Sequence, residues 1–193
     1  APFSAFVFKN ISDPYVGQLS LLRVFSGVLA SNTGFYNVNK KLKERIGQIY
    51  ILQGKEQRGQ ETAACGDIVA IAKLKETGIA DSLSQDKEQF LFDGLTFPEP
   101  AISSSVKPKS REDEEKISPA LHKLTAEDPT FKVTHDGQTR ELIISGLGDL
   151  HLDVMVGRLK KRFNVTVDLG IPKVSYKETI SKNAKVQGKF KRQ

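Results

Sequence analysis

The chain has 193 residues, and its 38% hydrophobic content is sufficient to build a core in each of two modest domains. Its one cysteine, Cys65, excludes an internal disulfide, and no apolar run reaches the roughly 18 residues of a membrane span, so we expect a cytoplasmic protein that does not enter a membrane. Because the chain starts without Met, lacks a signal-peptide pattern and ends without a stop signal, we interpret it as a piece of a longer protein.

Basic residues gather at the end of the chain. The stretch from Lys173 to Gln193 contains seven basic residues and one acid, Glu178, so it accounts for the whole formal net charge of +6. Such a stretch attracts phosphates and indicates a nucleic-acid partner. An equally acceptable interpretation is a solvated linker, and composition does not choose between the two.

The first part of the chain predicts short strands separated by turns. Strands are expected at residues 3–8, 18–25, 35–38, 45–52 and 68–74. Between them lie turn sequences such as Asp13 to Gly17 and the loop 53–60. Without any sustained helical period, this spacing predicts a small antiparallel β-barrel over residues 1–85. The polar segment 77–89 is interpreted as the boundary region.

The second part predicts alternating strands and helices over residues 86–171. A strand at 102–106 precedes a helix that Ser110 caps and that runs to about Ala126, although Pro119 should kink or split it. A hairpin at 131–134 and 141–145 turns at Asp136-Gly137. The last elements are a helix that begins at Leu150, is capped by Asp149 and has Leu159 in its apolar stripe, and a strand at 165–169. This order predicts a ferredoxin-like βαββαβ sandwich, so the fold class is mainly β plus α+β.

No catalytic or metal-binding residue is predicted. Gly146-Leu147-Gly148 lacks the third glycine of a dinucleotide fingerprint, since His151 stands there, so we interpret it as a sharp turn and His151 as a packed or hydrogen-bonded side chain. The sequence contains no G-x-x-x-x-G-K-[ST] motif. Cys65 is expected to be a small buried side chain without chemistry.

Two basic groups are candidate RNA-binding sites on barrel loops. One consists of Lys40, Lys41 and Lys43, and the other of Lys55 and Arg58 in the loop 53–60. Exposed lysines and arginines can contact phosphates, but the same pattern is also typical of solvated turns. Both interpretations remain open at this point.

Three groups of segments resemble the elongation factor G family of translational GTPases. They are 13–19 with 23–29, then 97–100 with 126–131 and 144–152, and finally 174–180 with 188–193. The resemblance implies the family's second domain, its third domain and, over residues 172–193, the start of its fourth. The usual Thr-Gly-Asp-Thr-Leu appears here as Gly78-Ile79-Ala80-Asp81-Ser82-Leu83, so a divergent paralogue is an alternative.

The resemblance implies a ribosome-binding factor that promotes GTP-dependent translocation of tRNA and mRNA. GTP and Mg²⁺ would bind in a nucleotide-binding domain upstream of Ala1, so this fragment would hold no cofactor and would not be an enzyme. Its expected partners are small-subunit rRNA, ribosomal proteins and the parent's own GTPase domain, and a monomer is expected. A ribosome-protection or recycling paralogue of the same architecture, or a stand-alone RNA-binding module, are the alternatives.

Overall fold

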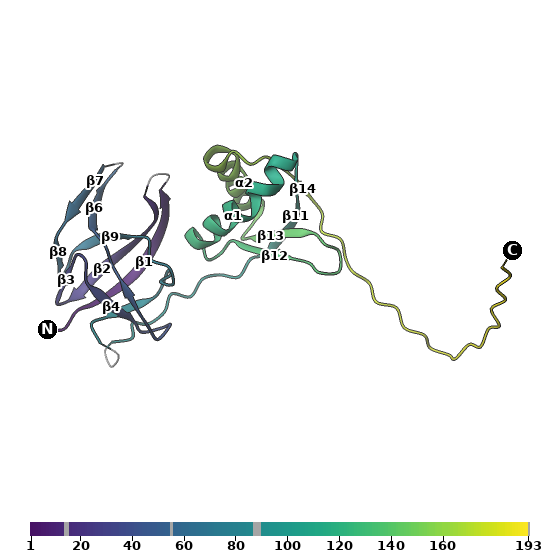
Figure 1. Ribbon diagram of the computed structural model, residues 1–193, viewed down its shortest axis with the longest axis horizontal. Helices are drawn as coiled ribbons and strands as arrows, with labels where there is room; N and C mark the ends of the chain where they lie inside the picture. Colours follow the sequence, from purple (N-terminus) through teal and green to yellow (C-terminus); the bar gives the residue numbers. More distant parts are fainter. Residues whose placement is uncertain (14–15, 55, 87–89, 193) are drawn as a thin grey trace.

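A computed structural model describes residues 1–13, 16–54, 56–86 and 90–192. The described residues form an N-terminal β domain and a C-terminal α/β domain, and beyond them residues 171–192 extend away without a helix or strand (Figure 1). The predicted fold class, a β-barrel followed by a ferredoxin-like sandwich, is confirmed.

The N-terminal domain, which we call the barrel, is built from antiparallel strands. Its strands are β1 (Ser4–Asp13), β2 (Gly17–Ser26), β3 (Val28–Ala30), β4 (Gly34–Asn37), β5 (Leu42–Arg45), β6 (Ile49–Gln53), β7 (Glu56–Gln60), β8 (Thr62–Ala64), β9 (Ile68–Ala72) and β10 (Ser82–Ser84). Eight of them form a sheet in the order β5-β4-β10-β1-β2-β9-β6-β7, and β3 pairs with β8. The register of β1 on β2 shifts after Ser4 and again after Val7, and such irregularities bend a sheet so that it can enclose a core.

Three details of the barrel differ from the sequence prediction. The expected strand 45–52 is divided between two strands, β5 and β6. Most of the expected loop 53–60 is strand β7, which pairs with β6 throughout. The predicted boundary region 77–89 contains β10, which pairs with β1 and β4 inside the sheet. Cys65 is exposed rather than buried, and its thiol donates to the carbonyl oxygen of Phe25 at 2.9 Å.

The C-terminal domain consists of one sheet and two helices. Its elements are β11 (Ile102–Pro108), α1 (Arg111–Glu127), β12 (Lys132–His135), β13 (Leu142–Gly146), α2 (Asp149–Phe163) and β14 (Val167–Gly170). The antiparallel sheet has the order β12-β13-β11-β14, and both helices pack on one of its faces (Figure 1). Leu124, Ile144, Met155 and Leu159 are fully buried between helices and sheet. The apolar stripe predicted for the second helix is therefore the core-facing side of α2.

Both helices begin close to the predicted positions. Ser110 caps α1 as expected, since its hydroxyl accepts the Asp113 amide at 3.1 Å. Pro119 does not split α1: it lies on the exposed side, while Ala120 and Leu121 next to it are buried and hold the helix on the sheet. For α2 the predicted cap is wrong, because Gly148 occupies the N-cap position and Asp149 is already the first helical residue.

The segment between the domains is fastened to the barrel. The ring of Phe92 lies 4.8 Å from the ring of Phe25 and 5.9 Å from that of Phe6, centroid to centroid. The Phe92 amide also donates to the Ser82 hydroxyl at 3.1 Å. These contacts bind the start of the connecting segment to the outer side of β1 and β2.

Candidate nucleic-acid interface

Of the predicted RNA-binding group Lys55 and Arg58, Arg58 falls on the β6–β7 hairpin. Arg58 lies in β7, opposite Ile51 of β6, and its side chain is 70% exposed. Its guanidinium is 3.0 Å from the carboxylate of Glu56, which is equally open to water. An exposed pair of this kind contributes little free energy, so Arg58 can exchange Glu56 for a phosphate. Lys55 lies outside the described residues.

The predicted group of Lys40, Lys41 and Lys43 falls on the β4–β5 hairpin. Lys40 and Lys41 are in the turn, where Lys41 adopts a positive φ of 58°, whereas Lys43 is not in a loop but in β5. The Lys40 ammonium binds the carbonyl oxygen of Glu76 and lies 3.9 Å from the carboxylate of Asp81. Lys40, Lys41 and Lys43 are all exposed, but the ammonium of Lys40 is already engaged by Glu76 and Asp81, which makes Lys40 less available to a phosphate.

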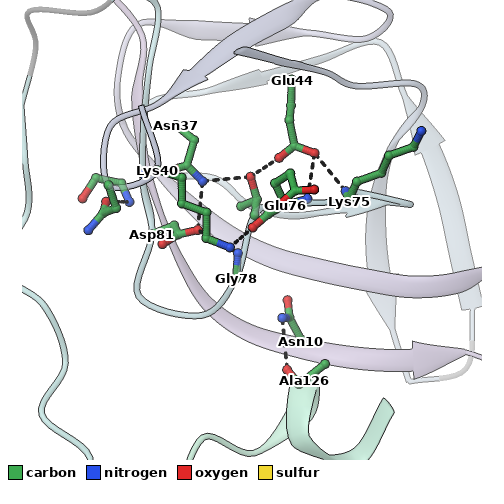
Figure 2. Close-up of polar contacts among 12 residues, drawn as sticks. Asn10, Asn37, Lys40, Glu44, Lys75, Glu76, Gly78, Asp81 and Ala126 are labelled. Carbon is green, nitrogen blue, oxygen red and sulfur yellow. Dashed lines mark hydrogen bonds and ion pairs between the residues drawn. The ribbon is translucent and has the colours of Figure 1, made fainter. Parts of the chain in front are cut away.

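Buried polar side chains hold this turn against the segment 75–81 (Figure 2). The fully buried Asn37 donates to Asp81 at 2.8 Å and to Thr77 at 3.1 Å, and its oxygen accepts the Lys40 amide at 3.0 Å. One carboxylate oxygen of Glu44 accepts the amides of Lys75 and Glu76, at 2.8 and 3.1 Å. The turn that carries Lys40 and Lys41 is therefore fixed in shape.

The carboxylate of Glu44 is the charged centre of that network. Its partial burial opposes ionisation, but hydrogen bonds from the Thr77 hydroxyl and from the amides of Glu76, Lys75 and Thr77 outweigh this, so the pKa of Glu44 lies below its ordinary value. Sequence analysis did not single out Glu44, because a Glu between two basic residues of a strand carries no distinctive pattern.

The two basic groups are not brought together. The β4–β5 hairpin and the β6–β7 hairpin stand at opposite ends of the strand order in the sheet. Lys40 instead faces a cleft of about 450 Å³ that it lines with Asn10, His122 and Ala126, between the barrel and the end of α1. The β6–β7 hairpin and the β4–β5 turn are thus separate surfaces.

Direct hydrogen bonds join the barrel to the C-terminal domain at the end of β1. The Ser12 amide donates to the carboxylate of Glu127 at 2.6 Å, and the Ser12 carbonyl accepts the guanidinium of Arg162 at 2.7 Å. The Arg162 guanidinium also donates two hydrogen bonds of 2.8 Å each to the carboxylate of Glu127. We call Ser12, Glu127 and Arg162 the interdomain clamp. Nearby, the Asn10 amide group donates to the Ala126 carbonyl at 3.1 Å (Figure 2).

The clamp favours an ionised Glu127. Burial raises the pKa of this carboxyl. The hydrogen bonds from Arg162 and Ser12 and the charge of Arg162 lower it by a larger amount, so the net pKa lies below its ordinary value. The pKa of Arg162 is raised, first of all by its hydrogen bond to Glu127. Both groups therefore stay charged at neutral pH.

A further hydrogen bond connects the clamp with the β6–β7 hairpin. The side-chain amide of Gln57, in β7, donates to the carboxylate of Asp13 at 2.9 Å, and the Val16 amide donates to the other oxygen of the same carboxylate at 2.8 Å. Asp13 directly follows Ser12 of the clamp. The β6–β7 hairpin, the β1–β2 hairpin and the ends of α1 and α2 therefore meet in one region.

His151 has a structural position, as predicted. Its Nδ1 accepts the Leu147 amide at 3.1 Å, so the proton is on Nε2, which donates to Asp128 at 3.2 Å. A side chain at Gly146 would place its Cβ 2.9 Å from the His151 ring, which explains the first glycine of Gly146-Leu147-Gly148. Within the described part of the chain, no three His, Cys, Asp or Glu side chains are placed to hold a metal ion.

Comparison with known proteins decides the family. A model described as Elongation factor G domain 2 matches residues 2–86, and one described as Elongation Factor G, domain III, matches residues 97–171. The chain belongs to the elongation factor G family. A crystal structure of a protein from Thermus thermophilus superimposes with a TM-score of 0.78 at 30% sequence identity, covering 90% of this chain.

The elongation factor G match is partial in length. This chain spans 26% of the Thermus thermophilus protein. The barrel corresponds to the family's domain 2 and the ferredoxin-like unit to its domain III. The start of a fourth domain at residue 172 stays a prediction, since the matched ranges end at residue 171. No helix of the described residues is long and apolar enough to cross a membrane.

Proposed function

We propose that this chain is the ribosome-binding middle part of a translational GTPase that promotes GTP-dependent translocation of tRNA and mRNA. The observation that carries the proposal is the presence of elongation factor G domains 2 and III, in that order, over most of the chain. The parent protein would bind GTP and Mg²⁺ in a domain outside these residues, act in the cytoplasm as a monomer, and contact small-subunit rRNA, ribosomal proteins and its own GTPase domain.

The β6–β7 hairpin is the proposed contact with small-subunit rRNA. Arg58 supports this role because its charge is exposed and only weakly engaged by Glu56. Lys41 and Lys43, which are exposed on the other hairpin, are proposed as weaker contacts, together with Lys40. The interdomain clamp would hold domain III in a defined position while the barrel is bound.

Charge reversal at the hairpin tests the proposal. Replacing Lys55 and Arg58 with Glu should weaken binding to purified small ribosomal subunits and reduce the slope of log K against log [salt] by roughly one for each lost phosphate contact. The matched control is Lys132→Glu together with Lys109→Glu, which makes the same charge change on domain III, where both lysines are already paired with acids. If the slope of log K against log [salt] is unchanged in the folded hairpin variant, the hairpin does not contact the rRNA.

A further inference from the structure

A cleft of about 640 Å³ lies between the two domains, beside the interdomain clamp. Its barrel wall is the β1–β2 hairpin, with Ser12, Asp13 and Gly17, and its other wall comes from α1 and α2. The helical wall carries three cations and one aromatic ring, from Lys123, Lys161, Arg162 and Phe163. Neither domain alone forms this cleft, because the clamp brings the two walls together.

The lining of the cleft is rich in cations. Arg162 is neutralised by Glu127 through two hydrogen bonds. Among the described residues, neither Lys123 nor Lys161 has a carboxylate within ion-pair distance. An anion that enters the cleft would therefore meet two lysines that are not paired with a described carboxylate.

The shape and lining of the cleft suit a nucleic-acid backbone. The ammonium of Lys123 lies 5.7 Å from the centroid of the Phe163 ring, and the guanidinium of Arg162 lies 5.4 Å from it on the same ring. The ring thereby positions both cations without neutralising them. Both lysines are exposed, as a groove that follows a phosphate chain requires.

The position of the cleft connects it to the proposed rRNA contact. Asp13 in its wall accepts a hydrogen bond from Gln57 of β7. Arg58 follows Gln57 in this edge strand and points to the other face of the sheet, so an RNA strand bound by Arg58 would reach the cleft by passing around the edge of β7. We propose that the cleft binds a phosphodiester of the same ribosomal RNA, with Lys123 and Lys161 as the phosphate ligands. This inference rests on the proposed function, and it adds a contact that both domains build together.

Neutralising the two lysines provides the first test. Lys123→Gln with Lys161→Gln should lower the affinity of the full chain roughly tenfold at moderate salt and reduce the salt slope by up to about two. Binding is measured to two probes, purified small ribosomal subunits and protein-free small-subunit rRNA. The control, Lys109→Gln with Lys132→Gln, removes the same charge from lysines that are paired with Asp168 and Glu99.

Breaking the clamp provides a second test, in which charge alone and the proposed site predict opposite changes in RNA affinity. Glu127→Ala removes a negative charge beside the cleft, so charge alone predicts tighter RNA binding. The proposed site predicts weaker binding, because the Ser12 amide and the Arg162 guanidinium both lose their acceptor on Glu127, and the Arg162–Ser12 hydrogen bond alone remains to hold the helical wall against the barrel at the clamp. Circular dichroism at 222 nm checks that α1 and α2 remain folded.

Each outcome has a defined meaning. Loss of affinity and slope on both probes in the lysine variant, with little change in the control, supports the cleft. No loss, an equal loss in the control, or tighter binding of Glu127→Ala overturns it. A loss on ribosomal subunits but not on protein-free rRNA also overturns it, since the ligand would then be an acidic protein surface. Arg58→Glu, measured in parallel, tests the hairpin separately, so either contact can fail while the other stands.

Discussion

The barrel and domain III hold their structures together in different ways. The barrel buries many polar side chains, among them Asn37, Thr77, Asp81 and Ser82, and these hold its connecting segments. Domain III relies mainly on the apolar faces of two helices. Helices satisfy their own backbone groups except at the ends, whereas a sheet with many short connections needs side chains to do so. The two domains should therefore be weakened by different kinds of substitution.

The largest effect is expected from a cavity in domain III. Leu159 of α2 is fully buried among Ile144, Met155 and other apolar residues, so Leu159→Ala should destabilise this domain by roughly 2 to 5 kcal/mol. Unfolding in urea is followed by circular dichroism at 222 nm, because the helices of the described residues all belong to this domain.

The control for this cavity is on the same helix. Val154 is 46% exposed, so Val154→Ala should change the free energy of unfolding by no more than about 0.5 kcal/mol. If Leu159→Ala cost less than about 1 kcal/mol, the apolar side of α2 would not be the stabilising surface of domain III.

A smaller effect is expected from the polar network of the barrel. Asn37→Ala leaves the partners of its amide, Thr77 and Asp81, and the Lys40 amide without their hydrogen bonds, and should cost roughly 1 to 3 kcal/mol. Tyrosine fluorescence reports on the barrel, since residues 97–171 contain no tyrosine. Asn183→Ala in the exposed tail is the matched control. A cost equal to that of the control would mean that the network does not stabilise the barrel.

The smallest effect concerns the contact between the two domains, and it depends on pH. Because the pKa of Glu127 is lowered from its ordinary 4.5, the stability that the clamp adds is complete above that value and is lost as the pH falls through the folded-state pKa. Wild type should therefore exceed Glu127→Gln by roughly 1 kcal/mol near pH 7, and this gap should close in acid.

Comparing wild type with Glu127→Gln isolates the contribution of the clamp to the free energy of unfolding. The pKa values of Glu44 and Asp128 are also lowered: partial burial raises them, but hydrogen bonds, and for Asp128 also His151, outweigh it. Because they are present in both proteins, their contributions cancel in the difference of urea unfolding free energies. A gap that stays constant from neutral to acidic pH would show that ionised Glu127 does not hold the domains together.

The sequence was most informative where a pattern is local. The cap at Ser110, the apolar stripe of α2 and the succession of strands and helices in domain III follow from the neighbours of each residue in the chain, and all three were predicted. The strand β10 was missed because Ser82-Leu83-Ser84 is short and polar, and only its pairing with β1 and β4 buries it. Strand β7, with Arg58 and Gly59 among its five residues, likewise depends on its partner β6.

The candidate interface was only partly accessible from sequence. Cations such as Arg58 can be recognised from the sequence by residue type, and the turn signals around them placed both basic groups on the barrel. The clamp could not be predicted, because Ser12 and Arg162 are 150 residues apart in the chain and neither belongs to a recognisable motif. The same holds for the cleft, whose walls belong to different domains.

The anchored Phe92 shortens the tether between the domains. With its ring held by Phe6 and Phe25, and with the Ala101 amide bonded to the Gly146 carbonyl at 2.9 Å, only residues 93–100 span the gap. A short tether confines domain III to a small volume and gives its surface a high effective concentration at the barrel, on the order of millimolar for flexible linkers. A clamp of a few hydrogen bonds is then sufficient to keep the two surfaces together.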